Sequence, residues 1–405
     1  MKKILFLGQY FYPEINSSAA LPFDTARFLA SHGFEVHALT GYPKEYNHFG
    51  KVPERETVEN VHIRRLHYLQ ASRGSRLGRL VNFFSFTLCV LFHIFLLRGY
   101  DLVLVYSNPP ILPMIPLLAK RLFGSPFLFV AYDVYPEVAY PSNSVRPRSM
   151  IDLVMRRINK GIYSEAAGVV ALTEEMRSFL LQHRPELSAE RICAIPNWAI
   201  EEGQGTAFIQ ADDNCNGPFV VTYFGNMGIC QDMDTLMDAA ALLKDDEHVQ
   251  FLFVGFGSKK FEIEERARSE ALRNVTFLGH LSGDEFARAV SRTGCSVVTL
   301  ERGLAGTCAP SKFYSCLYAG FPVLAIAEPE SFLTTVINKE KIGFSVPQGD
   351  ASALRDRILW MSEHRDACRQ MGLHAQTVYC EQYARELALS AYEDWIMKCL
   401  DPKVR

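Results

Sequence analysis

Two glycine-containing turns and one lysine carry residue types that can hold an anionic ligand. The turn Gly225–Gly228 lies between an expected strand and a helix expected to begin near Asp232. Such a turn can direct backbone N–H groups and the positive end of a helix at a phosphate. A second glycine turn covers Gly255–Lys259, and Lys312 falls in the first turn of another expected helix, where a cation is unfavourable unless an anion is near. A plain turn and a solvated lysine explain the same residues, so both interpretations stand.

One carboxylate in the first half of the chain could act as a base. Asp133 follows the apolar run Phe127–Ala131, with Tyr132 before it and Glu137 four residues later. A carboxylate there could take the proton of an incoming hydroxyl or orient it, and the tyrosine could stack on a sugar ring. A helix cap is an equally good explanation of an aspartate at this position.

Strand and helix signals alternate along the whole chain, which favours parallel sheets covered by helices. In the first half we expect a helix over about Ala19–His32 and strands at Ile4–Leu7, Glu35–Thr40, His62–Leu66, Leu102–Tyr106, Phe127–Ala131 and Gly168–Leu172. In the second half we expect strands at Val220–Phe224, Phe251–Val254, Val275–Leu278, Ser296–Leu300, Pro322–Ala325 and Phe344–Val346. Ligands of such sheets bind beyond the carboxyl ends of the strands, which is where the residues above lie.

A polar stretch rich in Gly, Asp and Asn interrupts this alternation, so we expect two domains. The predicted division is a first domain over residues 1–199, a linker over 200–217, a second domain over 218–375, and a terminal helix over 376–405 that packs back on the first domain. A chain of 405 residues is comfortable for two domains of this size.

Composition excludes several classes of protein. The net charge of −3 argues against nucleic-acid binding. The ten cysteines include no CxxC pair and no cluster of metal-ligating spacing, so we expect no metal site and a reducing, cytoplasmic location. The second glycine turn is not a dinucleotide fingerprint, because Lys260 stands where the third glycine would be, and this disfavours an oxidoreductase. The short apolar run near the N-terminus predicts a strand, not a signal peptide.

Six segments together resemble family-4 glycosyltransferases. The segments are Asp133–Glu137, Thr173–Met176, Ile195–Ala199, Gly225–Gln231, Val254–Gly257 and Pro310–Val323. They occur in the family's order over nearly the whole chain. The likeness is closest to the branch that builds O-antigen and capsule repeat units, whose members include L-fucosaminyltransferases.

The resemblance implies a fold and an activity. The fold would be GT-B, in which two doubly wound Rossmann-like domains face a central cleft. The second domain would bind a nucleotide sugar, which we expect to be UDP-linked and to carry an N-acetylated amino sugar. Transfer would retain the anomeric configuration and would need no metal or other cofactor. The acceptor would be a lipid-diphosphate-linked saccharide in surface polysaccharide synthesis.

The family pattern also assigns residues to the two substrates. The expected donor-binding residues are Gly225, Asn226, Gly228, Gln231, Gly255, Gly257, Ser258, Lys259, Thr307, Pro310, Ser311, Lys312 and Ser315. The expected acceptor-binding residues are Asn16, Ser17, Ser18, Ser107, Asn108, Tyr132, Asp133 and Glu137. Asp133 and Lys312 are the expected catalytic residues.

At several of these positions the chain departs from the family. Asn226 and Gln231 stand where many relatives have an Arg and a Lys on the diphosphate, and Thr307 and Ser315 stand where many have two glutamates. Ser107 or Asn108 replaces a common histidine. Neutralising the diphosphate would therefore depend on Lys312 and Lys259.

The apolar segment Leu80–Leu97 has a second interpretation beside that of a core helix. Its eighteen residues would span about 27 Å, short of a ~30 Å hydrocarbon core, and a spanning helix would split one domain across the membrane. Its polar residues fall on one stripe, and arginines flank it at positions 73, 76, 79 and 98. We expect monotopic attachment to the inner face of the cytoplasmic membrane through Phe84, Leu88, Phe92 and Phe95.

Two other functions fit the same sequence. A nucleotide-sugar 2-epimerase shares the fold but needs acid and base groups at the sugar and no acceptor. A non-catalytic partner subunit would tolerate the missing Arg, Lys and glutamates.

Overall fold

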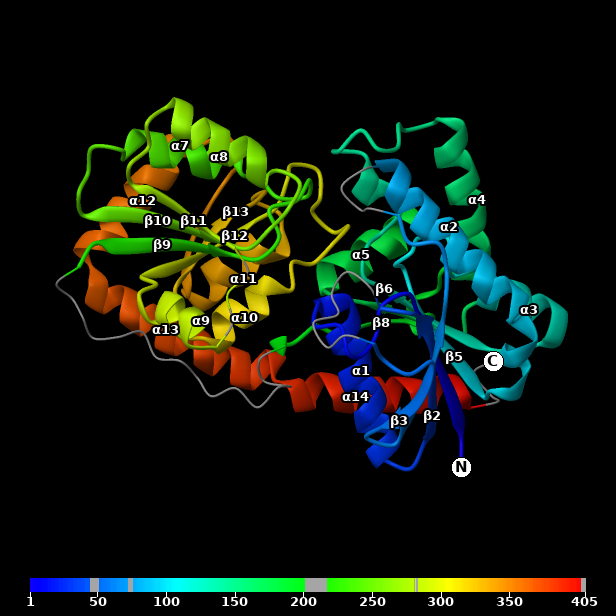
Figure 1. Cartoon of the computed structure of the whole chain (residues 1–405). Coiled ribbons are helices and arrows are strands. Elements are labelled where there is room, and N and C mark those ends of the chain that lie inside the picture. The colour runs from blue at the N-terminus through cyan, green and yellow to red at the C-terminus, as the bar shows by residue number, and fades with distance from the viewer. Residues whose placement is uncertain (44–50, 72–75, 201–216, 280, 282, 402–405) are drawn as a thin grey trace. The chain divides into compact units, whose positions relative to one another are not determined.

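The computed structural model describes residues 1–43, 51–71, 76–200, 217–279, 281 and 283–401. The chain forms two compact units (Figure 1). Unit 1 comprises Met1–Ile200, Thr307–Ala309 and Glu386–Arg405, and unit 2 comprises Glu201–Gly306 and Pro310–Arg385. The expected linker over 200–217 lies almost entirely outside the described residues.

The described residues of unit 1 form an eight-stranded sheet, parallel except at one edge. In sheet order its strands are β3 (Arg55–Val58), β4 (Val61–Leu66), β2 (Glu35–Gly41), β1 (Lys3–Gly8), β5 (Leu102–Tyr106), β6 (Phe127–Ala131), β7 (Gly168–Ala171) and β8 (Ile192–Ala194). Every residue of β5 and β6 is buried, which explains why both strands are continuous apolar runs. Only β3 pairs antiparallel, with β4.

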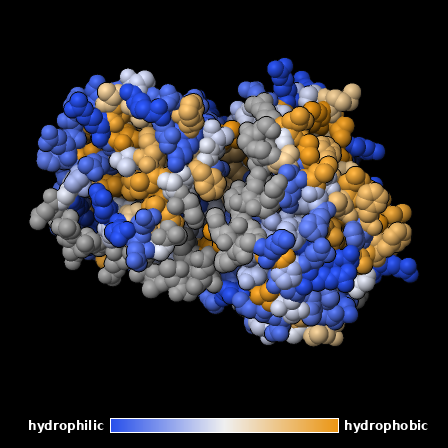
Figure 2. All heavy atoms as spheres, in the orientation of Figure 1, coloured by the Kyte–Doolittle hydropathy of each residue, from blue (hydrophilic) through white to orange (hydrophobic). Residues whose placement is uncertain are grey.

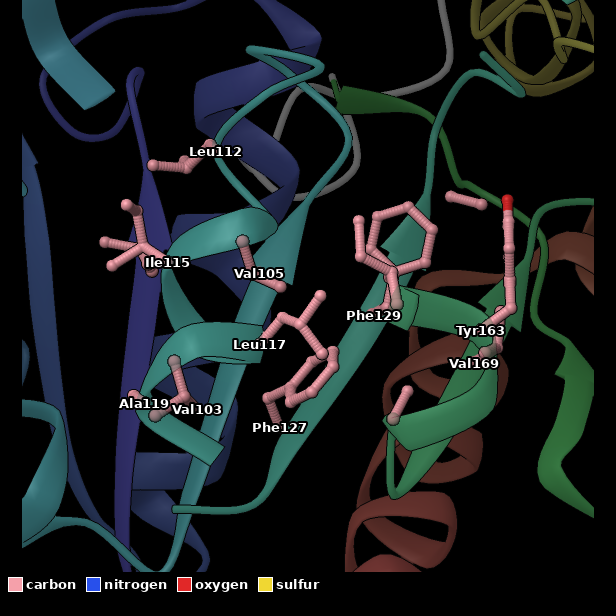
Figure 3. Packing of buried hydrophobic residues seen from close by; sticks show 14 of the residues in the cluster. Val103, Val105, Leu112, Ile115, Leu117, Ala119, Phe127, Phe129, Tyr163 and Val169 are labelled. Atoms are coloured by element: carbon pink, nitrogen blue, oxygen red, sulfur yellow. The ribbon is translucent and has the colours of Figure 1, made fainter. Parts of the chain in front are cut away.

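Helices cover both faces of this sheet. They are α1 (Ser17–Ser31), α2 (Arg76–Phe92), α3 (Met114–Phe123), α4 (Met150–Glu165) and α5 (Glu174–His183), with 3₁₀ turns η1 (Ile94–Gly99), η2 (Glu137–Ala139) and η3 (Ala189–Arg191). Ser149 caps α4 by accepting the Asp152 N–H, and Thr173 caps α5 by accepting the Met176 N–H. In Figure 3, Leu117 of α3 lies beside Val105 of β5 and Phe127 of β6.

The terminal helix α14 (Arg385–Leu400) belongs almost wholly to unit 1. Leu389, Tyr392 and Ile396 are buried in the same cluster as Ile4 and Phe6 of β1. The helix approaches β7 so closely that a Cβ at Gly168 would lie 2.5 Å from the Cys399 sulfur, so only glycine fits there.

The described residues of unit 2 form a six-stranded parallel sheet. Its order is β11 (Val275–Leu278), β10 (Val249–Val254), β9 (Phe219–Phe224), β12 (Cys295–Thr299), β13 (Val323–Ile326) and β14 (Gly343–Val346). Its helices are α7 (Asp234–Leu242), α8 (Lys260–Ser269), α9 (Gly283–Ser291), α10 (Lys312–Tyr318), α11 (Phe332–Glu340), α12 (Ala351–Glu363) and α13 (Arg365–Val378), and α13 continues into a π turn, η4 (Tyr379–Tyr383). Both units are thus Rossmann-like parallel α/β folds, as predicted.

The structure corrects three expected elements. The strand β3 was not expected, since its residues Arg55–Val58 alternate between exposed and half-buried and carry no apolar signal. The predicted helix Leu80–Leu97 is an α-helix that ends at Phe92, followed by η1. The expected tail helix is divided between α13 and α14 by η4.

Candidate active site

The donor residues expected from the sequence follow three adjacent strands of unit 2, namely β10, β9 and β12. The loops after β9 and β10 lie against each other, because Met227 N–H donates to Phe256 O at 2.7 Å and Lys259 N–H donates to Met227 O at 2.9 Å. This contact requires a glycine at position 257, which has φ 152°, since a Cβ there would lie 2.3 Å from Met227 O. The two expected glycine turns therefore form one packed structure.

The backbone N–H groups of Gly225 and Gly228, expected to face an anion, have hydrogen-bond partners within unit 2. Gly225 N–H donates to Val254 O, and Gly228 N–H donates to the Gln231 side-chain oxygen at 2.9 Å. The start of α7 is already capped by an anion, because the Asp232 carboxylate accepts the Thr235 N–H at 3.0 Å. A phosphate here would have to compete with these bonds.

Lys312 is a cation beside this turn. It lies at the start of α10, and a Cβ placed on Gly225 would be 3.8 Å from its Nζ. The half-buried ammonium lies 3.9 Å from the centre of the Tyr223 ring and donates to the Tyr223 hydroxyl. Within the described ranges no carboxylate pairs with it. Burial lowers the pKa of Lys312 to about 7, because the charged form has lost water and gained no anion.

Lys259, the second expected cation, is engaged differently. Its Nζ donates to Gln231 O at 2.9 Å and lies 3.2 Å from the Glu301 carboxylate. Its charge is therefore offset, and it links the loops after β9, β10 and β12. The remaining donor positions surround this group: Asn226 and Ser258 are exposed, and Pro310, Ser311 and Ser315 are half-buried beside Lys312 in sequence.

The expected acceptor residues lie at the carboxyl edge of three adjacent strands of unit 1. Asn16, Ser17 and Ser18 end the loop after β1 and open α1, while Ser107 and Asn108 follow β5, and Tyr132 and Asp133 follow β6. The Asp133 N–H donates to Ser107 Oγ at 3.0 Å, which joins two of these segments directly. Tyr132 packs on Tyr106 with ring centres 5.0 Å apart, so its ring is held against the residue that ends β5.

Asp133 is a half-buried carboxylate that caps no helix. Its backbone pairs in an isolated antiparallel bridge with Cys308, and Val134 N–H donates to Thr307 O at 2.7 Å. No described residue donates a hydrogen bond to its carboxylate or pairs with it. Burial raises the pKa of Asp133 to about 6, because nothing compensates the charged form. A base with a pKa close to the operating pH is well matched to proton transfer.

Two expected residues have other neighbours than those anticipated. Thr307, expected at the donor, is buried in unit 1 beside Asp133. Glu137, expected at the acceptor, is buried, and its carboxylate pairs with Arg184 at 2.6 Å and with Arg156 at 3.3 Å. Arg184 and Asn159 also donate to Tyr135 O, at 3.3 and 2.6 Å, so this network fixes the loop that carries Asp133.

Replacing Arg184 with alanine should lower the free energy of unfolding by about 3–5 kcal/mol, because it leaves the buried Glu137 carboxylate without its closest partner. Urea unfolding followed by circular dichroism measures the change. Arg268, which pairs with Glu265 on the exposed surface, is the matched control and should lose no more than about 1 kcal/mol. Equal losses in the two variants would show that the Glu137 network does not stabilise the fold.

Sequence reasoning missed four residues that belong to these sites. Tyr223, Glu301 and Arg184 act through contacts 42 to 89 positions away in the chain, which no local pattern shows. Gln9, directly after β1, is buried, and neither polar atom of its side chain has a partner among the described residues. Its position after the first strand was the one available signal.

Comparisons with known proteins agree with this geometry. The family model described as "Glycosyl transferase 4-like domain" matches residues 23–198, and that described as "Glycosyl transferases group 1" matches residues 207–378. The first match covers most of unit 1 and the second most of unit 2. The chain belongs to the glycosyltransferases.

Relatives and solved structures extend this result. The chain is 27% identical over 263 residues to the probable glycosyltransferase WbjE of Pseudomonas aeruginosa, a match that covers 64% of this chain and 65% of WbjE, just under two thirds of that relative. It is 23% identical over 349 residues to the putative colanic acid biosynthesis glycosyl transferase WcaI of Escherichia coli K12, covering 80% and 83%. The structure of Anabaena HepE in complex with UDP and glucose aligns with a TM-score of 0.71 at 16% identity, covering 98% and 100%. This likeness shows the GT-B fold.

Among the described residues of the glycosyltransferase, no helix is both long enough and apolar enough to cross a bilayer. The same residues contain no group of three or more His, Cys, Asp or Glu side chains arranged to hold a metal ion.

Proposed function

We propose that the protein transfers a sugar from a UDP-sugar to a lipid-diphosphate-linked saccharide in surface polysaccharide synthesis, at the inner face of the cytoplasmic membrane. The name of WcaI supports the pathway class, the name of WbjE supports glycosyl transfer, and the UDP complex of HepE supports the donor nucleotide. The donor sugar in our proposal is an N-acetylated amino sugar, in line with the family branch that the sequence resembles.

The environment of Lys312 is the observation that carries this proposal. Its ammonium is half-buried, has a depressed pKa and has no carboxylate partner in the described chain. Burying a charge in this way lowers the stability of the fold unless a ligand of opposite charge pairs with it. It lies over the turn at Gly225, at the carboxyl edge of the unit 2 sheet, where nucleotides bind in such folds. A diphosphate supplies the missing negative charge.

Asp133 and Lys312 take separate roles in the transfer. The bond between the anomeric carbon and the donor phosphate oxygen breaks, and a bond from the acceptor oxygen to that carbon forms on the same face, so configuration is retained. Lys312 stabilises the charge that develops on the departing diphosphate. The acceptor proton passes to Asp133 or to the departing phosphate oxygen, and Asp133 in either case orients the hydroxyl.

Removing divalent metal should leave donor binding unchanged. In this proposal Lys312 provides the positive charge, so the Kd of UDP measured by calorimetry should agree within about twofold between EDTA and magnesium buffers, well below the tenfold that 1.4 kcal/mol represents. A loss of tenfold or more in EDTA would mean that a metal bridges the diphosphate. Absence of UDP binding in both buffers would contradict the donor assignment itself.

A further inference from the structure

One surface of unit 1 exposes large apolar side chains from three helices. They are Leu77, Leu80, Phe84, Leu88, Phe92, Phe95 and Leu96 on α2 and η1, Met114, Leu118 and Leu122 on α3, and Met150, Ile151, Leu153 and Val154 on α4. More than half of the exposed large apolar side chains in the described part of the chain fall in this region. Figure 2 shows hydrophobic side chains gathered over α2 and α3. Such concentration marks a binding surface, whereas ordinary surface residues of this kind are scattered. We call it the three-helix surface.

The helix α2 presents apolar residues outward because its polar stripe forms hydrogen bonds with the backbone of the preceding segment. The Asn82 side chain accepts the Ala71 N–H at 2.7 Å and donates to Ala71 O at 3.0 Å, and Ser85 donates to Leu69 O at 2.9 Å. Phe86 and Val90 are fully buried in the core. By contrast Phe84 is 60% exposed and Phe92 is 76% exposed. A solvent-facing helix has the opposite arrangement, so these phenylalanines are placed for an apolar partner.

The three helices are joined into one continuous surface. Phe95 of η1 packs on Phe123 of α3 with ring centres 5.4 Å apart. Gly161 lets α4 approach α3, because a Cβ there would lie 2.9 Å from the Leu117 side chain, and Arg121 pairs with Glu165 at 2.5 Å. The helix α3 therefore packs against α2 and η1 on one side and against α4 on the other.

Positive charge borders the three-helix surface. Arg157 and Lys160 continue the face of α4 that begins with Leu153 and Val154, at helical spacings of three and four residues. They and Arg98 of η1 are exposed and pair with no carboxylate among the described residues. Between positions 76 and 123 the sequence has five Arg or Lys residues and one acidic residue. Arg73 and the side chain of Arg76 lie outside the described residues.

We propose that the three-helix surface docks on an anionic phospholipid bilayer, with all three helices in the plane of the interface. Apolar side chains enter the acyl boundary, and Arg98, Arg157 and Lys160 contact phosphate headgroups. A second copy of the chain fits less well, because a twofold interface would bring the same basic border onto both partners. The proposal goes beyond sugar transfer and extends the expected contact from α2 alone to α3 and α4.

Vesicle sedimentation tests the proposal without donor or acceptor, so its outcome is separate from that of the transfer reaction. The full chain should sediment with phosphatidylcholine vesicles that contain about one third phosphatidylglycerol, and much less with phosphatidylcholine alone. Changing Phe84, Leu88, Phe92 and Phe95 to glutamine should lower partitioning at least about a hundredfold, as should changing Met150, Ile151, Leu153 and Val154. Arg98→Glu, Arg157→Glu and Lys160→Glu together should abolish the preference for anionic lipid.

A matched control changes exposed apolar residues elsewhere, Leu242→Gln and Phe261→Gln on unit 2, and should sediment like wild type. Circular dichroism and light scattering accompany each variant. If the variant changed at Phe84, Leu88, Phe92 and Phe95 unfolds, the variant changed on α4 still tests the proposal. Three outcomes would each overturn the proposal. The wild type could stay in the supernatant with anionic vesicles, or the α4 variant could bind them like wild type. The protein could also be a dimer in solution that the α2 changes convert to a monomer.

Discussion

Replacing Asp133 with asparagine should slow sugar transfer by about 10²–10⁴-fold, the usual cost of losing a general base. Asparagine keeps the shape and the backbone contacts with Ser107 and Cys308, and it removes only the charge. The Kd of UDP should stay within about twofold of wild type, because the donor residues follow strands of unit 2. Initial rates and UDP calorimetry on the same preparation separate the two effects. Near-normal turnover with a normal acceptor KM would remove Asp133 from the mechanism.

The pH dependence of the rate gives an independent check on Asp133. Burial raises its pKa to about 6, so kcat should fall as pH drops below 6 and the carboxylate takes up a proton. The acidic limb should disappear in Asp133→Asn. A limb that persists in the variant would assign the titration to another group.

Stability separates this role from a structural one. The folded pKa of about 6 lies above the unfolded value of about 3.9, so the ionised carboxylate disfavours the native state. This penalty is absent below pH 4, grows between pH 4 and 6, and is constant above. Asp133→Asn should therefore match wild type in Tm near pH 4 and exceed it at pH 8. An aspartate kept for a helix cap or an ion pair would show the opposite sign.

Replacing Lys312 with alanine should weaken UDP binding by about 1.5–3 kcal/mol, the range for a hydrogen bond to a charged group. That loss corresponds to roughly ten- to 150-fold in Kd. The exposed Lys339 of α11, which pairs with Glu340 at 2.9 Å, is the matched control, and its alanine variant should bind UDP like wild type. Unchanged UDP affinity in Lys312→Ala would exclude this lysine from the donor site.

Proton uptake on binding distinguishes Lys312 from an ordinary surface cation. Its pKa of about 7 means that the free protein is largely neutral at this site at pH 8, whereas bound diphosphate favours the charged form. UDP should bind more weakly as pH rises from 7 to 8.5, with uptake of a proton that calorimetry in buffers of different ionisation enthalpy detects. The terminal phosphate of UDP, with a pKa near 6, is already ionised in this range. Lys312→Arg should keep affinity and lose the pH dependence.

The strands that build the two sheets could be predicted because burial on both faces leaves a continuous apolar signal. Leu102–Tyr106 and Phe127–Ala131 match β5 and β6 residue for residue. The edge strand β3 could not be predicted, since Arg55–Val58 has one half-buried face and its sequence is typical of a polar loop. The break at His93 was also hidden, because apolar residues continue through η1.

The positions of the candidate residues after strands could be predicted, but the partners of their side chains could not. Lys312 was expected to meet an anion, yet its contact with Tyr223, 89 positions away, and the pKa that results depend on the fold. Glu137 seemed free to bind a substrate because Arg184 is 47 positions away in the chain. The polar stripe of α2 was visible in the sequence, but its contact with the segment that ends at Ala71 depends on the fold.

Transfer from a labelled UDP-sugar into the lipid fraction of bacterial membranes tests the central claim most directly. UDP-glucose and UDP-N-acetylglucosamine are each incubated with the full chain and detergent-solubilised lipid extract, and label in the butanol phase is counted. We expect lipid-bound label with at least one donor, and at least about a hundredfold less with Asp133→Asn. No lipid-bound label from either donor, release of free sugar alone, or conversion of the donor to its epimer would contradict the account.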